Sequence, residues 1–143
     1  MTTAVVPFIS AHLDLIDLHE TMSFMNGRMG NGYGEGLASY PSYSYISNSK
    51  VLACAGVFPL GTYRYQAWAL MSKDSGQSMV GITKEVKKFL GMFEGKRVET
   101  HVLYGFDAGE KWMKMLGFKK ETSEPMRKYG DDGKDYYLYA RVK

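Results

Sequence analysis

The sequence predicts an α/β fold with a mixed central sheet of six to seven strands. The clearest sign is the stretch Tyr65–Tyr104. Its apolar pattern has a period of two over Tyr65–Met71, a period of 3.6 over Gln77–Phe93, and again a strand-like pattern over Arg97–Tyr104. Runs typical of short strands precede and follow it. A strand–helix–strand unit favours a parallel pair with a right-handed crossover. The start of its helix is a natural site for an anion.

The composition is that of an ordinary globular protein. The chain has 143 residues, of which 45% are hydrophobic and 23% charged, so we expect one domain over residues 1–143. A net charge of +3 slightly favours an anionic ligand, and with no basic run longer than two residues nothing points to nucleic acid. Cys54 is the single cysteine, which excludes an intrachain disulfide. The start does not resemble a signal peptide, and Val51–Gly61 is too short to span a membrane, so we expect a cytoplasmic protein.

The N-terminal third predicts a strand and then a helix. Ala4–Ile9 reads as a strand, and Pro7 favours the edge of the sheet. Ser10 is the expected cap of a helix whose apolar positions are Leu15, Leu18, Met22, Met25 and Met29. His12 and His19 share a face of this helix, and we expect both to be solvated, because no further metal ligand lies nearby.

Residues 26–36 contain five glycines and fragments of a G-x-G pattern. A dinucleotide-binding fingerprint must follow a strand, and this stretch follows a helix, so we reject that interpretation. We predict a loop that carries Tyr33, Tyr40, Tyr43 and Tyr45, with Tyr33 and Tyr40 as candidate substrate-binding residues at one lip of a site. A plain flexible connection is equally open.

Two runs, Tyr43–Ser47 and Lys50–Phe58, predict an antiparallel hairpin that turns at Asn48-Ser49. Alternation places Val51 with Ala53, Ala55 and Val57 on one face, and Leu52 with Cys54 and Phe58 on the other. Both faces are apolar, which indicates a central strand with Cys54 in the core.

The later helices carry recognisable ends. Asp74, answered by Gln77, is expected to cap the helix over Gln77–Phe93, and Asp107 with Glu110 forms a predicted capping box for the next. The buried face of that second helix is predicted to hold Trp112, Met115 and Leu116, and Gly117 to end it.

The C-terminal part predicts strands again. Phe118–Glu121 and Met126–Tyr129 read as one strand interrupted by Pro125, Gly130–Gly133 as a turn, and Tyr136–Val142 as a last strand that pairs back. The order of elements is strand, helix, helix, three strands, helix, strand, helix and two strands.

This order resembles the GCN5-related N-acetyltransferase (GNAT) superfamily over nearly the whole chain. Lys73-x-x-Gly76-x-Ser78 is similar to a weakened form of the family's Arg/Gln-x-x-Gly-x-Gly/Ala loop. The ending from Trp112 through Leu116-Gly-Phe118 to Asp135–Arg141 resembles the family's short helix, Leu-Gly-Phe, strand and hairpin. In general look the chain is closest to divergent bacteriophage members, which would place it in a host cytoplasm.

The resemblance implies a GNAT-like sheet with helices on both faces and acetyl-CoA as cosubstrate, without a metal. It also implies an amine on a small molecule or protein as acceptor, and it leaves a homodimer open. A glycine turn at a helix N-terminus offers N–H groups to the pyrophosphate. A free N–H near Leu70 or Met71 would polarise the thioester carbonyl. The candidate cofactor-binding residues are Leu70, Met71, Lys73, Ser75, Gly76, Gln77 and Ser78. An ordinary capped helix start is the alternative for this turn.

The sequence departs from the family at the general acid. Met113 aligns with the usual tyrosine of the second helix and carries no proton to donate. His101 is the candidate base, since a histidine titrates near neutral pH, and Tyr104 is the candidate acid. The alternatives are a polar residue on the outer sheet face and a core tyrosine. Two functions therefore stand: an acyl-CoA-dependent N-acyltransferase, or a non-enzymatic interaction or virion protein on a GNAT scaffold.

Overall fold

The computed structural model describes residues 3–19 and 32–143. The chain forms two compact units, Met1–Phe58 with Ala67–Glu85 and Pro59–Gln66 with Val86–Lys143. In the described residues seven strands form one mixed sheet in the order β1-β2-β3-β4-β5-β7-β6, which confirms the predicted fold class. That the whole chain is one acyl-CoA-binding domain stays a prediction.

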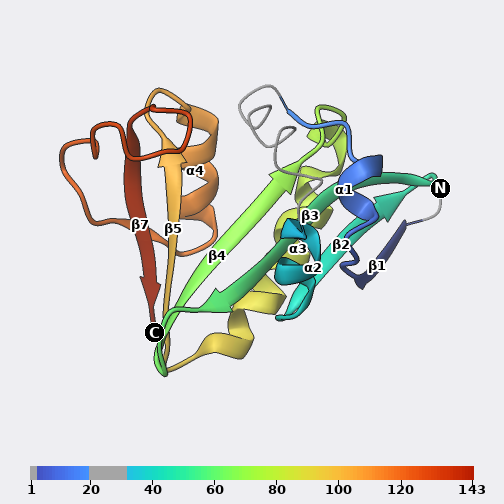
Figure 1. The fold of residues 1–143 in the computed structure, drawn as a ribbon, viewed down its shortest axis with the longest axis horizontal. Helices are drawn as coiled ribbons and strands as arrows, with labels where there is room; N and C mark the ends of the chain where they lie inside the picture. Colours follow the sequence, from blue (N-terminus) through green and yellow to red (C-terminus); the bar gives the residue numbers. More distant parts are fainter. Residues whose placement is uncertain (1–2, 20–31) are drawn as a thin grey trace. The chain divides into compact units, whose positions relative to one another are not determined.

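The elements follow one another in the predicted order, with 3₁₀ turns added at both ends of α3 (Figure 1). They are β1 (Thr3–Pro7), α1 (His12–Leu15), α2 (Tyr33–Ala38), β2 (Ser42–Ser47), β3 (Lys50–Pro59), β4 (Arg64–Met71), η2 (Gly76–Ser78), α3 (Met79–Leu90), η3 (Gly91–Phe93), β5 (Arg97–Leu103), α4 (Asp107–Met115), β6 (Lys119–Lys120) and β7 (Tyr136–Val142). No helix in residues 3–19 and 32–143 is long and apolar enough to cross a membrane.

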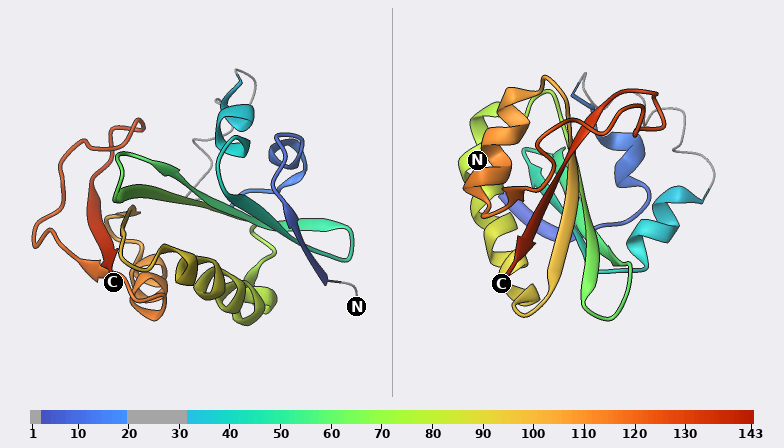
Figure 2. Two further views of the ribbon diagram at one scale, coloured as in Figure 1. Left: turned by 90° about the horizontal axis from the view of Figure 1, so that it is seen from below. Right: turned by 90° about the vertical axis from the view of Figure 1, so that its left-hand side faces the viewer.

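In the first unit, helices lie on both faces of the sheet: α1 and α2 on one, and the first part of α3 on the other (Figure 2). One core cluster joins side chains of the segment around α1, of α2 and of β3 and β4. Its buried members are Phe8, Leu13, Ile16, Leu37, Val51, Cys54 and Leu70. As Pro7 suggested, β1 is an edge strand, and it pairs with β2 alone.

The predicted hairpin is confirmed, with one correction. Asn48 and Ser49 have φ of 51° and 65°, as a two-residue hairpin turn requires. The register shifts between the pairs Tyr45↔Ala53 and Ile46↔Val51, so β3 holds one extra residue. Because of this β-bulge, the side chains before it face the opposite side of the sheet from the one that simple alternation predicts. Val51 therefore shares a core cluster with Cys54, and its predicted place beside Ala53 was wrong.

The predicted N-terminal helix is too long. α1 ends at Leu15, because Ile16 adopts extended backbone and Leu18 pairs as an isolated bridge with Ser72. Ala11 is its N-cap, whereas the Ser10 hydroxyl donates to Glu35 over 3.4 Å. The expected helical positions Met22, Met25 and Met29 lie outside the described residues.

Two further expectations for the N-terminal third were wrong. His12 is buried rather than solvated, since its Nδ1 lies 2.7 Å from the buried Ser44 hydroxyl. Part of the predicted glycine-rich loop is helical, because Tyr33–Ala38 forms α2 and buries Leu37 against the core. The glycines at 27 and 30 lie outside the described residues.

In the second unit, β5 pairs in parallel with the first three residues of β4 and antiparallel with β7. α4 lies along β5 (Figure 1). Val98 and Val102 of β5 and Met113 and Leu116 of α4 and its cap are buried. The predicted burial of Met115 was wrong, because this side chain is 58% exposed.

The predicted start of α4 was wrong, and its predicted end is confirmed. The expected capping box is absent, since Phe106 is the N-cap and makes no side-chain bond. Glu110 instead accepts a hydrogen bond from the Tyr139 hydroxyl (2.5 Å) and pairs with Lys120 (2.9 Å). Gly117 ends the helix as predicted, with φ of 91°. The N–H of Phe118 donates to Met113 and that of Gly117 to Lys114, which is a Schellman ending.

β7 spans the predicted Tyr136–Val142, but its predicted partner is much shorter. β6 comprises two residues, and Met126 makes only a bridge to Tyr136. Tyr129, expected at the end of a strand, lies in the loop before β7. Lys128 turns the chain there with φ of 52° and donates its N–H to the Asp135 carboxylate (2.9 Å).

Candidate functional site

The turn from β4 into α3 is built around the buried Ser72. Its hydroxyl accepts the N–H of Asp74 (3.0 Å), and its carbonyl accepts that of Ser75 (3.1 Å). The N–H of Ser78 then donates to Ser75 (2.8 Å) and begins η2. Asp74 does not cap the helix as predicted. Ser75 is the N-cap residue of η2, without a side-chain cap hydrogen bond, and the Asp74 carboxylate lies 4.0 Å from the ammonium of Lys50.

The predicted cofactor-binding residues meet at this turn but differ in access. Gly76 and Gln77 are exposed together with Lys73, and Ser78 is half-buried. A Cβ at Gly76 would have open space within 4 Å. The backbone hydrogen bonds that close the turn are donated by the N–H groups of Ser75, Ser78 and Met79. The N–H groups of Gly76 and Gln77 are not among these donors. Leu70, Met71 and Ser75 are buried beneath.

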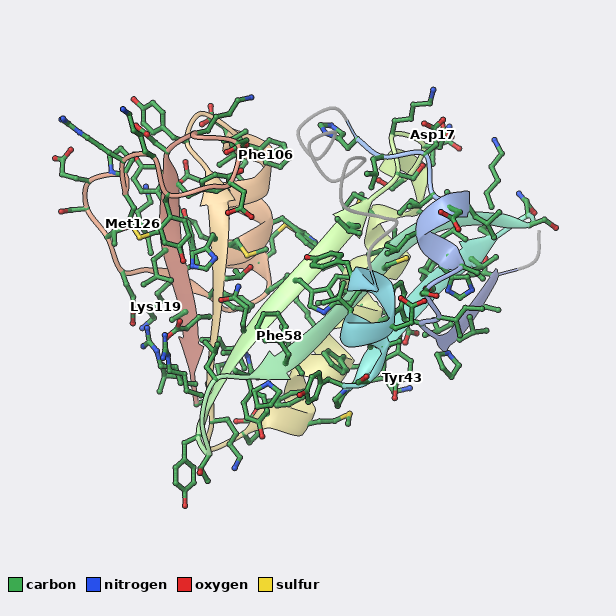
Figure 3. The ribbon with its side chains drawn as sticks, viewed as in Figure 1. Asp17, Tyr43, Phe58, Phe106, Lys119 and Met126 are labelled. Atoms are coloured by element: carbon green, nitrogen blue, oxygen red, sulfur yellow. The ribbon has the colours of Figure 1, made fainter. Side chains whose placement is uncertain are left out.

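Asp17 is a member of this site that sequence reasoning missed. Its carboxylate lies 3.0 Å from the Lys73 ammonium, and its carbonyl accepts the Lys73 N–H (2.9 Å) (Figure 3). The hydrogen bond that the Lys73 ammonium donates to Asp17, and then the charge of Asp17, raise the pKa of Lys73. Both side chains are exposed, so solvent screens the pair and it contributes little to stability. Nothing in the local sequence indicates this pairing, because it depends on where the chain passes after α1.

The N–H of His19 donates to the Met71 carbonyl (2.8 Å), so the segment after α1 runs along the end of β4. Tyr33 and Tyr40, the candidate substrate-binding residues, belong to the same unit. They lie at the start of α2 and just after it, 36% and 45% exposed. Their substrate role stays a prediction.

In the second unit His101 lies on β5 between two polar partners. Its Nδ1 is 3.3 Å from the Gln66 amide nitrogen, and its Nε2 is 2.8 Å from the Tyr129 hydroxyl. The imidazole and phenol rings lie against each other with centroids 4.6 Å apart and planes tilted by 40°. Burial lowers the pKa of His101, and the charge of Glu99 opposes this effect. Burial therefore favours the neutral form of the ring. Neither Gln66 nor Tyr129 was a candidate at the level of sequence.

Glu99, two residues before His101, is buried between two guanidinium groups. Arg64 binds both carboxylate oxygens at 2.6 and 3.1 Å, and Arg97 Nε donates to one of them at 2.8 Å. The Arg64 hydrogen bond, with Arg97 adding to it, lowers the pKa of Glu99 to about 2. Arg97 also forms a bidentate pair with Glu121. The two glutamates and two arginines balance in charge, so the group is a neutral network.

Tyr104 and Met113 complete the set of candidates. Tyr104 lies just past β5 and is 57% exposed, so the alternative of a core tyrosine is excluded. Its ring packs on Tyr137 with centroids 5.8 Å apart, whereas the ring nitrogens of His101 contact Gln66 and Tyr129. The structure therefore does not bring the two catalytic candidates together. Met113 lies on the buried face of α4.

No protein-family model matches the chain, and no curated protein matches it in sequence. Solved structures do. An N-acetyltransferase from Staphylococcus aureus Mu50 aligns with a TM-score of 0.72 at 12% identity, over 99% of each chain. The chain has the GNAT acetyltransferase fold.

Two further acetyltransferase structures match over almost the whole chain. A phosphinothricin acetyltransferase from Sinorhizobium meliloti, solved in complex with AcCoA, gives a TM-score of 0.66 at 14% identity, covering 99% of this chain and 88% of that one. The ribosomal-protein-S18-alanine N-acetyltransferase from Escherichia coli gives 0.65 at 14%, covering 98% and 93%.

The chemistry of the β4–α3 turn is compatible with the phosphate end of acetyl-CoA, a role that stays a prediction. Gly76 is exposed with open space at its Cβ position, which allows a ligand close to the backbone, and the 12-residue helix α3 that follows has the positive end of its dipole at this turn. The positive charge of Lys73 is shared with Asp17. Within residues 3–19 and 32–143 no group of three or more His, Cys, Asp or Glu side chains could hold a metal ion.

Proposed function

We propose that this protein is an acyl-CoA-dependent N-acyltransferase that moves an acetyl group from acetyl-CoA to an amine on a small molecule or a protein. The observation that carries the proposal is the GNAT fold over the full chain. Its structural relatives are N-acetyltransferases, and one was solved with AcCoA. The exposed turn at the start of α3 supports it.

In this proposal the residues of the turn hold the cosubstrate. The N–H groups of Gly76 and Gln77 would bind the pyrophosphate, and the N–H of Leu70 would polarise the thioester carbonyl. Lys73 would add a positive charge that it shares with Asp17. Acetyl-CoA supplies an activated acyl group and a thiolate leaving group. Proton transfer would fall to the cluster around His101, whose partners hold the ring in one orientation.

A thermal melt with acetyl-CoA tests the binding step. A ligand at about 100 times its dissociation constant should stabilise the fold by about 2.7 kcal/mol. Gly76→Asp should abolish that gain, because it places bulk and negative charge where the phosphates would lie. Gly61→Asp is the matched control: a Cβ there also meets open space, and it lies in the other unit. The binding claim fails if neither acetyl-CoA nor CoA changes the melt, or if Gly76→Asp binds like the parent.

A second function, a non-enzymatic interaction protein on the same fold, is favoured by Met113. The resemblance assigns a tyrosine acid to its position, and here a thioether is buried on α4. This reading expects a stable protein partner and no response to acyl-CoA. Copurification of one partner together with silent CoA titrations would support it. The likeness to bacteriophage proteins and the cytoplasmic location stay predictions.

A further inference from the structure

The two edges of the sheet differ in how they are protected against pairing. β6 forms one edge with two residues, and both are lysines. Very short strands and lysine side chains are two of the devices that keep a sheet edge from pairing with another chain. β1 forms the other edge with five uncharged residues (Figure 1). The neighbouring β2 is uncharged as well, so neither of these two outermost strands would repel another strand.

The backbone hydrogen bonds beside β1 show which of its groups point away from β2. Phe8, just after the strand, donates its N–H to the carbonyl of Ser42, which lies opposite it in the register of the two strands (3.1 Å). In an antiparallel ladder, such hydrogen-bonded pairs alternate with pairs whose N–H and C=O groups point outward. The residues of β1 that direct these groups to the free edge are therefore Thr3, Val5 and Pro7.

The outward groups form a short row of hydrogen-bond donors and acceptors. Thr3 and Val5 offer an N–H and a carbonyl each, whereas Pro7 offers a carbonyl alone and ends the row. Among residues 3–19 and 32–143, β2 pairs with β1 on one side, and no strand pairs with it on the other. Val5, at the centre of the row, is 43% exposed. The row is therefore accessible to another extended chain.

We propose that β1 is the interface of a symmetric dimer, in which it pairs antiparallel with β1 of a second copy of this chain. A twofold axis at Val5 places this residue opposite its counterpart and places Thr3 opposite Pro7 of the second copy. Every outward N–H then meets an outward carbonyl, because Val5 bonds to Val5 and Thr3 donates to Pro7. The N–H that Pro7 lacks leaves only the carbonyl of Thr3 without a donor, at the rim, where water can bind it.

The side chains of β1 fit the same register. The two Val5 side chains lie opposite each other, and Ala4 lies opposite Val6 of the second copy, so a small side chain meets a larger one. An unrelated strand would have to match this spacing, whereas a second copy does so by symmetry. Pairing of the two β1 strands uses up both open edges, so the assembly closes as a dimer. One pair of five-residue strands makes a small interface, which is typical of a weak, reversible complex.

Sedimentation velocity of the full chain, without acetyl-CoA, tests the proposal. The sedimentation coefficient should rise toward that of a dimer between about 10 µM and 1 mM, the range of affinity expected of an interface this small. This dimer does not depend on the proposed function, because no ligand takes part in it. A parent that sediments as a monomer at every concentration in this range overturns the proposal.

Two variants of Val5 test the register without removing a bond within the chain. Val5→Pro deletes the outward N–H, which does not face β2, and proline is tolerated on an edge strand. The loss of one such hydrogen bond per chain should weaken the dimer by about tenfold or more. Val5→Lys places two like charges opposite each other and should weaken it at least as much. At the lowest concentration both variants should melt as the parent does.

Leu15→Lys is the matched control for the lysine variant. Leu15 belongs to the same unit and is 67% exposed, so the substitution makes the same change in charge on an exposed apolar residue. It should leave the dissociation constant within twofold of the parent. Self-association that both Val5 variants leave unchanged, or that Leu15→Lys abolishes while they do not, overturns the proposal.

Cross-linking gives an independent measurement of the same contact. Val5→Cys should yield covalent dimers with a short bismaleimide reagent, because the two residues at position 5 face each other across the axis. Cys54 is fully buried and should not react in the native protein. Leu15→Cys is the control and should stay monomeric. Equal yields of dimer from the two variants would show random collision and overturn the assignment of β1.

Discussion

Replacing Glu99 by Gln should remove a large share of the stability of the second unit. The Glu99 side chain is 7% exposed and accepts hydrogen bonds from Arg64 and Arg97. Its pKa of about 2, against an ordinary 4.5, corresponds to about 3 kcal/mol at 1.36 kcal/mol per unit. Because Arg64 is half-exposed and can be solvated when its partner is neutralised, we expect a loss of about 2–3 kcal/mol in the free energy of unfolding.

Urea denaturation at a series of pH values measures this loss and checks its sign. The folded pKa of Glu99 lies below its unfolded value, so its stabilisation is complete above about pH 4.5 and is lost as the pH falls toward about 2. The gap between parent and variant should be full at pH 7 and narrow below pH 4.5. Glu121→Gln is the control, since that side chain is 38% exposed, and it should cost under about 1 kcal/mol. A Glu99→Gln loss no larger than that of the control, or one independent of pH, would refute the reasoning.

Three further predictions concern residues of the first unit. Cys54 is fully buried, and burial raises its pKa to about 11, so a thiol reagent should label it only after denaturation; rapid labelling of the native protein would contradict the placement of β3. Gly56→Ala should cost about 1–3 kcal/mol in a urea melt, because its Cβ would lie 2.6 Å from Ser42 Cβ and 2.7 Å from a backbone carbonyl, whereas Gly61→Ala meets open space and should be near neutral; equal effects would disprove the close approach. Burial lowers the pKa of His12, so the unfolded chain takes up its proton first and stability should fall as the pH drops below about 6.5; His12→Asn should reduce this fall, and an unchanged pH dependence would argue against a buried neutral ring.

Local patterns in the sequence were sufficient for most of the fold. The change of apolar period between β4, α3 and β5 depends only on which residues lie on one face of each element, so it is visible without a structure. The turn at Asn48-Ser49 and the helix end at Gly117 depend on backbone conformations that few residue types adopt, and these too were predicted correctly.

What the sequence could not supply were features that arise when distant segments meet. The helix after Ser10 was predicted to continue because its apolar spacing does, but Leu18 pairs instead with Ser72 at the end of β4. Asp74 and Glu110 fit capping motifs in the local sequence, yet their carboxylates pair with Lys50 of β3 and Lys120 of β6. The bulge at the start of β3 likewise reflects the fit between two strands.

The residues of the candidate site likewise include one that the sequence could identify and others that it could not. His101 could be singled out from the sequence, because it lies near the end of a predicted strand and a histidine titrates near neutral pH. Its partners could not, since Gln66 is 35 residues away along the chain and Tyr129 is 28. Which ring nitrogen carries the proton, and which hydroxyl is left exposed, depends on those two contacts. The sequence alone therefore determined the fold class and the elements that carry the candidate groups, whereas the tertiary structure decided which groups meet, because hydrogen bonds between strands depend on register and loop path.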